Sequence, residues 1–341
     1  MIETGKTASA DDRQLLSVIV PLHDEESGLH LLVEQLTKVL DGLDMDAEVI
    51  FVDDGSEDRT AALAGEFAAS DSRIKLVVLS RNFGHQAAIS AGMDYASGDA
   101  LVVMDGDLQD PPKEIPGFVA KWREGYDVVY AVRRSRKEGP HKRAAYWVFY
   151  RLLRRVSMIE VPPDSGDFGL IDRRVVQILR QMPERNRFLR GLRSWVGLRQ
   201  VGVDVDRQVR SAGASKYTLA KLIGLAMDGF ISFSYAPLQL ATRTGFVVSG
   251  LGFLFGAWMI VLRLGWGIEV PGWTSLMVVV VFLGGVQLIT TGILGEYIGR
   301  IYDEVKRRPL YIVAQTTNLD RDPLPVDSDR RARPEGVEQR L

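Results

Sequence analysis

The sequence contains no cysteine among its 341 residues. This absence excludes disulfide bonds and fits a reducing compartment. The chain also lacks a strong net charge, because 42 Lys and Arg residues against 44 Asp and Glu residues give −2 at pH 7. That balance is not the signature of a polyanion-binding protein, so no nucleic-acid partner is expected. The first fourteen residues are polar and contain no apolar stretch, so we expect no cleavable signal peptide.

Charge is missing from two long segments near the end of the chain. Residues 245–262 and 276–294 carry no charged side chain, and each segment is about long enough to cross a bilayer. They predict a transmembrane hairpin at 243–299, with spans at 245–264 and 275–297. Two buried core helices are the alternative, which the absence of charge over such lengths disfavours.

The basic residues around these segments predict their orientation. Arg243 precedes the first segment, Arg300 and three more basic residues follow the second, and only Arg263 lies between them. The positive-inside rule then places both termini in the cytoplasm. We therefore expect a plasma-membrane (inner-membrane) protein with two spans and a cytoplasmic catalytic domain. The helical spacing of apolar residues over 216–235 predicts an interfacial amphipathic helix before the first span.

The other domain boundaries follow from composition. We predict a flexible amino terminus at 1–15 and an α/β domain at 16–240. A juxtamembrane segment is expected at 300–315. The last residues, 316–341, are charged and contain no aromatic side chain, which is typical of a disordered tail.

Residues 17–133 alternate between apolar runs and helical patterns. The runs predict strands at 17–22, 48–52, 74–79, 100–104 and 127–132. The patterns between them predict helices at 29–40, 60–69, 86–96 and 114–122. Repeated units of this kind predict a mainly parallel sheet covered on both faces. A G-x-G-x-x-G turn is missing after the first run, so dinucleotide binding of that type is not expected.

Two of the predicted strands end in carboxylates. Asp105 and Asp107 follow the run at 100–104, and Asp53 and Asp54 follow the second run. Open α/β folds bind ligands at the carboxyl ends of their strands. Two carboxylates there can hold Mg²⁺ or Mn²⁺, and such a metal usually completes its shell with substrate phosphates. For Asp53 and Asp54, turn and helix-capping chemistry is the alternative.

Six segments resemble the sequence motifs of a known family and follow one another in the same order as those motifs. They are VPLHDEE, VDDGSEDRT, LSRNFGHQAAISAGMDYASGD, VMDGDLQDPP, DSGDFGLIDRR and RSAGASKY. With these, the chain resembles family 2 glycosyltransferases of the GT-A fold, a Rossmann-like α/β fold. The resemblance covers roughly residues 15–315, including the membrane hairpin that ends in GEYIGRIYDEVKRRP. It is strongest to polyprenyl-phosphate glycosyltransferases of the dolichyl-phosphate mannose synthase type, and among these to bacterial two-span members that glucosylate undecaprenyl phosphate. The usual Tyr-Asn of the first motif is His23-Asp24 here.

The resemblance implies a role for individual residues. The metal, Mg²⁺ or Mn²⁺, would be bound by Asp105, Asp107 and Gln109. The nucleotide sugar would be bound by Pro21, His23, Glu25, Asp53, Asp54, Asp105 and Gly106. Three basic donor-binding residues would face phosphate groups, namely Arg133, Arg210 and Lys216. The catalytic residues would be Asp107 and Asp167, where Asp167 matches the position of a proposed base and orienting the acceptor or metal is the alternative.

The activity implied is inverting transfer of a sugar to undecaprenyl or another polyprenyl phosphate for cell-envelope glycans. UDP-glucose is the expected donor, with N-acetylglucosamine, galactose, mannose or aminoarabinose as alternative sugars, and a homo-oligomer is expected. A processive polysaccharide synthase is a second possibility, but the Q-x-x-R-W motif and further spans of that class are missing from the sequence. A membrane-tethered pseudoenzyme that binds a nucleotide sugar is a third, and the intact Asp53, Asp105, Asp107, Gln109 and Asp167 argue against it.

Overall fold

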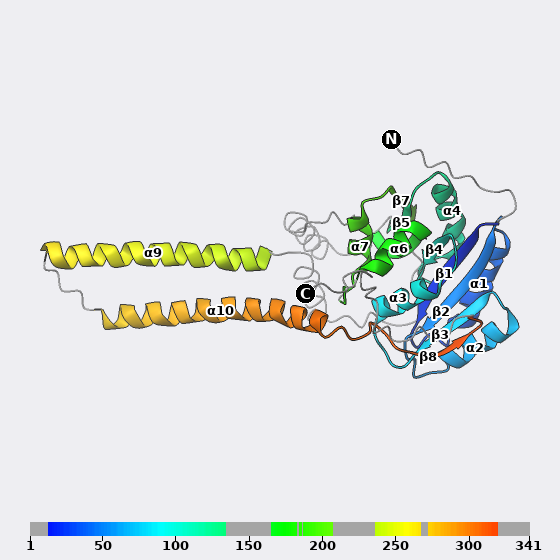
Figure 1. Cartoon of the computed structure of the whole chain (residues 1–341), viewed down its shortest axis with the longest axis horizontal. Helices are drawn as coiled ribbons and strands as arrows, with labels where there is room; N and C mark the ends of the chain where they lie inside the picture. Colours follow the sequence, from blue (N-terminus) through cyan, green and yellow to red (C-terminus); the bar gives the residue numbers. More distant parts are fainter. Residues whose placement is uncertain are drawn as a thin grey trace, which may run out of the picture. The chain divides into compact units, whose positions relative to one another are not determined.

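The structure, a computed structural model, describes residues 13–133, 165–182, 184–185, 187–206, 236–266 and 272–319. These residues form two compact units (Figure 1). The sheet unit contains the described residues up to 206 together with 308–319, and the helical unit contains the described residues of 236–307. Each unit is described by itself.

The sheet unit is built on one eight-stranded sheet with the order β7-β5-β6-β4-β1-β2-β3-β8. Its strands are β1 (Leu15–Leu22), β2 (Asp46–Asp53), β3 (Ile74–Leu79), β4 (Ala100–Val103), β5 (Val128–Arg133), β6 (Ser165–Asp172), β7 (Gln200–Val205) and β8 (Val313–Thr317). Strands β3, β2, β1 and β4 are parallel neighbours, whereas β6 runs antiparallel to both β4 and β5. The prediction of a mainly parallel α/β sheet is confirmed.

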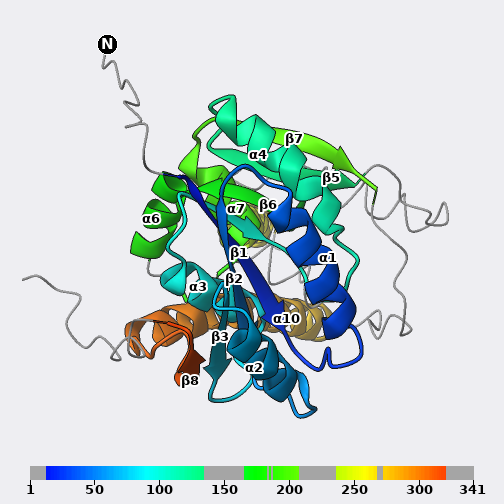
Figure 2. The ribbon, with the colours of Figure 1, turned by 90° about the vertical axis from the view of Figure 1, so that its right-hand side faces the viewer.

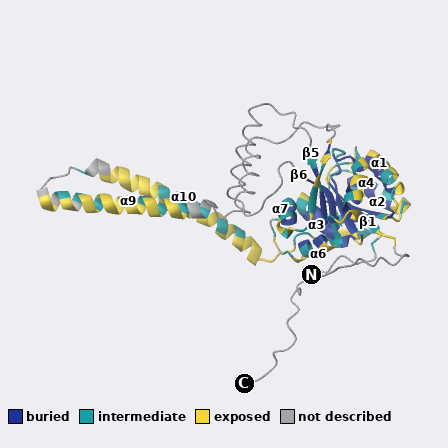
Figure 3. Cartoon of the chain, turned by 90° about the horizontal axis from the view of Figure 1, so that it is seen from above, coloured by how far each residue is buried: buried dark blue, intermediate teal, exposed yellow. Residues whose placement is uncertain are grey.

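Helices cover both faces of this sheet (Figures 2 and 3). One face packs against α1 (Leu29–Asp41), α2 (Thr60–Ser70) and, after a short 3₁₀ turn at Pro112–Glu114, α4 (Ile115–Arg123). The other face packs against α3 (His85–Tyr95), α6 (Arg173–Gln181) and α7 (Leu189–Val196). Successive strand residues point to opposite faces, so Val18 and Val20 belong to the first core and Ile19 to the second. Burial on both sides explains why these strands are continuous apolar runs.

The carboxyl-terminal part of the sheet differs from the sequence prediction. Residues 313–317, predicted to span the juxtamembrane segment and the disordered tail, form β8, which pairs antiparallel with β3. Tyr311 and Leu319 on either side of β8 pack against the second core. Residues 316–319 are therefore ordered, contrary to the prediction for the start of the tail. The sequence did not predict this strand because a short strand with exposed polar residues carries little apolar signal, and pairing with β3 stabilises it.

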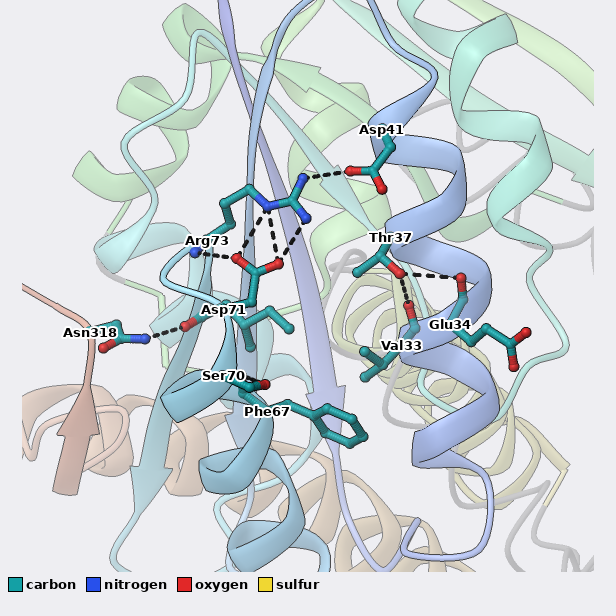
Figure 4. Close-up of polar contacts among 10 residues, drawn as sticks. Val33, Glu34, Thr37, Asp41, Phe67, Ser70, Asp71, Arg73 and Asn318 are labelled. Carbon is teal, nitrogen blue, oxygen red and sulfur yellow. Dashed lines mark hydrogen bonds and ion pairs between the residues drawn. The ribbon is translucent and has the colours of Figure 1, made fainter.

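Asn318 holds the end of β8 against α2 and β3. Its amide nitrogen donates hydrogen bonds to the carbonyl oxygens of Ala68 and Ile74, 2.5 and 2.9 Å away. Figure 4 shows Asn318 with one of these hydrogen bonds. Its backbone has a φ of 58°, a left-handed conformation that asparagine tolerates well. In the same region, Arg73 pairs with Asp71 and with Asp41 at the end of α1.

Substitution of Asn318 by alanine is expected to lower the free energy of unfolding by about 2 kcal/mol, because it removes both hydrogen bonds and strains the backbone. Asn318→Gly removes the same hydrogen bonds but accepts the positive φ, so about half of that loss is expected. Thermal unfolding of the two variants and the parent measures the difference. Equal stability of all three would contradict the role assigned to Asn318.

The helical unit consists of α9 (Ala236–Trp266) and α10 (Trp273–Val305), which contact each other. Among the described residues, one helical segment, Leu276–Val305, is long and apolar enough to span a membrane, with a mean hydropathy of 2.2 in its most apolar window. Large apolar side chains of α9, such as Phe253 and Leu254, are also exposed. Figure 3 colours much of α9 as exposed. The predicted interfacial helix at 216–235 lies outside the described residues.

Candidate active site at the carboxyl ends of the central strands

The strand order of the sheet reverses between β1 and β4, because β2 and β3 lie on one side of β1 and β4 lies on the other. Ligands bind open α/β sheets at such a point, beyond the carboxyl ends of the strands. The last residues of β1 and β2 and the loops that leave β1, β2 and β4 there carry most of the predicted site residues: Pro21, His23, Glu25, Asp53, Asp54, Asp105, Gly106, Asp107 and Gln109. The topology thus brings three acidic loops to one edge of the sheet.

The loop after β4 is a tight turn packed against the end of β1. Asp107 Oδ1 accepts a hydrogen bond from the backbone N–H of Gln109, 3.1 Å away, and Leu108 between them has a φ of 59°. A Cβ atom at Gly106 would lie 2.7 Å from Leu22 Cδ2, closer than real side chains approach. Glycine therefore lets this turn approach β1 without displacing the side chain of Leu22.

Asp105, Asp107 and Gln109 offer the hard oxygen ligands that Mg²⁺ and Mn²⁺ prefer. In the part of the chain that the structure describes, no group of three or more His, Asp or Glu residues is arranged to hold a metal ion. Two carboxylates and an amide suit a metal that takes its remaining ligands from substrate phosphates. The residues present therefore fit a metal that is shared with a phosphate-bearing ligand.

Asp53 and Asp54 are buried and hold turns of the backbone. Asp53 accepts hydrogen bonds from the hydroxyl and the backbone N–H of Ser56, at 2.5 and 3.2 Å. Asp54 accepts from the backbone N–H groups of Phe83 and Gly84, at 2.7 and 2.9 Å, and burial raises its pKa. These contacts correspond to the turn-forming role that is the alternative to ligand binding for Asp53 and Asp54. Asp54 also joins the end of β2 to the loop that enters α3.

The loop after β1 is joined to the loop after β2. Asp24, with a φ of 55°, accepts from the backbone N–H of Glu57, and the backbone N–H of Glu25 donates to the hydroxyl of Thr60. The imidazole Nε2 of His23 lies 3.1 Å from the amide nitrogen of Asn82, on the loop after β3. These contacts connect the loops after β1, β2 and β3 with one another at this edge of the sheet.

Asp167 is brought to the same edge by the antiparallel strand β6. Because β6 runs opposite to β4, its first half lies beside the carboxyl end of β4. Asp167 is buried, and Arg190 of α7 forms a two-point ion pair with it, with nitrogen–oxygen distances of 2.9 and 3.2 Å. The Gln86 amide nitrogen donates to the same carboxylate at 3.2 Å. Asp105, Asp167 and Arg190 line a single small pocket.

His85, the first residue of α3, lies between the two acids. Its Nε2 is 3.5 Å from Asp105 Oδ1 and 3.6 Å from Asp167 Oδ2. Burial by itself would raise the pKa of Asp167, but the nearby His85 imidazole and the charge of Arg190 bring it well below the usual aspartate range. A carboxylate so stabilised in its ionised form is a weak proton acceptor. This environment favours an orienting role for Asp167 over that of a base.

Sequence reasoning missed His85, Gln86, Arg190 and the buried Arg193. Arg193 lies over the ring of Tyr130, 5.0 Å from its centroid, and burial lowers its pKa to about 10. His85 and Gln86 lie in the LSRNFGHQAAISAGMDYASGD segment, which was recognised as a motif without roles for its members. No sequence pattern distinguished Arg190 and Arg193 from the many other arginines between residues 133 and 210.

The structure does not describe the side chains of the three predicted basic residues, Arg133, Arg210 and Lys216. Arg133 ends β5, on the far side of β6 from β4, and its side chain lies outside the described part of the structure. Arg210 and Lys216 also lie outside the described residues.

Comparison with known proteins identifies the class. The family model for glycosyl transferase family 2 matches residues 17–179. An uncharacterized glycosyltransferase of Synechocystis sp. is 47% identical over 310 residues, which cover 91% of this chain and 98% of the relative. A prophage-derived bactoprenol glucosyl transferase of Shigella flexneri is 42% identical over 302 residues, covering 88% and 98% of the two chains.

The chain therefore belongs to glycosyl transferase family 2 and is a glycosyltransferase. The matched region begins in β1 and ends in α6, so it includes the three acidic loops, His85 and Asp167. The likeness to the relatives extends over almost their whole length, which includes segments beyond the family model.

Proposed function

We propose that this glycosyltransferase transfers glucose from UDP-glucose to undecaprenyl phosphate or a related polyprenyl phosphate. The observation that carries the proposal is the 42% identity to bactoprenol glucosyl transferases, which is spread over nearly the whole of those proteins. The pocket at the sheet edge is consistent with it, because acidic and basic groups meet there beside the predicted metal ligands. The product is a polyprenyl-phosphate sugar for the modification of cell-envelope glycans.

The roles of the residues follow the resemblance. Mg²⁺ or Mn²⁺ would be held by Asp105, Asp107 and Gln109 and would neutralise charge on the diphosphate of the donor. The nucleoside part would lie against the ends of β1 and β2 and the loops after them, at the positions Pro21, His23, Glu25, Asp53 and Asp54. Asp105 and Gly106, after β4, would also bind the donor. Arg133, Arg210 and Lys216 would bind phosphate groups.

The acceptor needs little activation, because a phosphate monoester is already anionic near neutral pH. Its oxygen attacks the anomeric carbon, a carbon–oxygen bond forms, and the bond to the diphosphate breaks with its electron pair leaving on the nucleoside diphosphate. No proton has to be removed in this step. The protein contributes by positioning the two substrates and by stabilising the leaving charge. The ion pair between Asp167 and Arg190 suits such a positioning role.

We also propose that the chain is a plasma-membrane protein with two spans, α9 and α10, and with both termini in the cytoplasm. The exposed apolar side chains of both helices support this topology. A homo-oligomer is proposed on the resemblance alone.

Purified protein incubated with undecaprenyl phosphate and a panel of nucleotide sugars tests the function. UDP-glucose is expected to give one lipid-linked product, with the α-linkage of the donor inverted to β as read by NMR. Transfer of another sugar would show that the donor is a nucleotide sugar other than UDP-glucose. A polymeric product would indicate a processive synthase. Donor binding without transfer to any lipid phosphate would contradict the proposed function.

A further inference from the structure

His85 is the one described histidine that lies close to two of the predicted site acids. Its Nε2 approaches Asp105, on the loop after β4, and Asp167, on β6, at nearly equal distances of 3.5 and 3.6 Å. Both carboxylates therefore meet the same nitrogen atom. The two acids belong to different predicted functions, since Asp105 serves the donor and its metal and Asp167 faces the acceptor.

The backbone of His85 is held on both sides. Before it, Phe83 and Gly84 donate their N–H groups to the buried Asp54, and Gly84 has a φ of 99°, which favours glycine. After it, the side chain of Gln86 accepts from the backbone N–H of Leu189 at 3.0 Å and donates to Asp167. A side chain supported in this way is preorganised rather than free to follow its partners.

Two ionised carboxylates that share a site repel each other unless a donor lies between them. The imidazole Nε2 of His85 lies between Asp105 and Asp167, where a proton on this nitrogen offsets the repulsion between the two carboxylates. Arg190 and Gln86 contact the Asp167 side of this pair. His85 approaches Asp105 as well as Asp167.

We propose that His85 is a positioning residue that sets the spacing between the donor-side Asp105 and the acceptor-side Asp167. This inference rests on the proposed function. In-line attack requires the acceptor phosphate, the anomeric carbon and the leaving diphosphate to be aligned, and a displacement of about 1 Å can cost about 10²-fold in rate. His85 thereby acts on the chemical step and contributes little to donor affinity.

Two substitutions separate this role from a merely structural one. His85→Leu removes the donor nitrogen, and kcat is expected to fall about 10²-fold while the KM for the nucleotide sugar changes by less than about threefold. His85→Gln places an amide nitrogen at a reach similar to Nε2 and is expected to recover at least about tenfold of the lost rate. His30→Gln, on α1 where His30 lies edge-on to Phe67, is the control and should leave both constants unchanged.

Equal losses in His85→Leu and His85→Gln would overturn the proposal, as would a rise in donor KM with an unchanged kcat. A second measurement does not need turnover. In a double-mutant cycle of His85→Leu and Asp167→Asn, the shifts in unfolding temperature are expected to be non-additive, and additive shifts would refute the contact. If the wild-type protein transferred no sugar to lipid phosphate, the proposed function would fail. The double-mutant cycle would still test whether His85 interacts with Asp167.

Discussion

Substitution of Asp107 by asparagine is expected to lower the rate of sugar transfer by about 10³-fold while the protein remains folded. The amide oxygen of asparagine can still accept the hydrogen bond from the N–H of Gln109, so the turn after β4 is retained. What the variant loses is a negative charge at the predicted metal site, which serves the leaving diphosphate. Steady-state rates with UDP-glucose and undecaprenyl phosphate, together with thermal unfolding, measure both parts of this prediction.

The matched control is Asp46→Asn, which changes an exposed acid at the opposite end of β2 and should leave the rate unchanged. Chelation of divalent metal by EDTA should abolish transfer by the wild-type protein, and Mg²⁺ or Mn²⁺ should restore it. Full turnover in metal-free buffer would remove the reason for assigning Asp105 and Asp107 to a metal. Unfolding of Asp107→Asn would show instead that the residue is required for the turn.

Truncation after Arg307 is expected to destabilise the sheet unit by about 3 kcal/mol or more, although it removes no predicted site residue. It deletes β8, the apolar contacts of Tyr311 and Leu319, and both hydrogen bonds of Asn318. It also deletes the carbonyl of Ile312, which accepts from the N–H of Ser80 at the start of the loop that leads to His85. A fall of about 10 °C in the unfolding temperature and a weaker affinity for the nucleotide sugar should follow.

Truncation after Leu319 is the control, because it removes only the segment that the sequence predicts to be disordered. Its unfolding temperature and donor affinity should match those of the full chain. Hydrogen exchange of β3 distinguishes the two truncations, since β3 loses its edge partner only in the shorter protein. If the shorter protein were as stable as the longer one, β8 would not contribute to the stability of the sheet unit.

The sequence by itself determined the central part of this protein. The apolar runs at 17–22, 48–52, 74–79 and 100–104 correspond to β1, β2, β3 and β4 within two residues at each end. These strands are buried on both faces by local βα units, so nearly every residue in them must be apolar and the pattern is visible without the fold. The same logic placed Asp105 and Asp107 at the carboxyl edge, because the strand before them is unambiguous.

Only the tertiary structure decided the rest. Strands β6 and β8 pair antiparallel with strands that lie far away in the sequence, so local periodicity does not predict them. The approach of His85 and Arg190 to Asp167 depends on α3, α7 and β6 meeting at one edge. The sequence could show that these side chains carry chemistry, but which of them share a site is a property of long-range packing, which apolar periodicity along the chain does not encode.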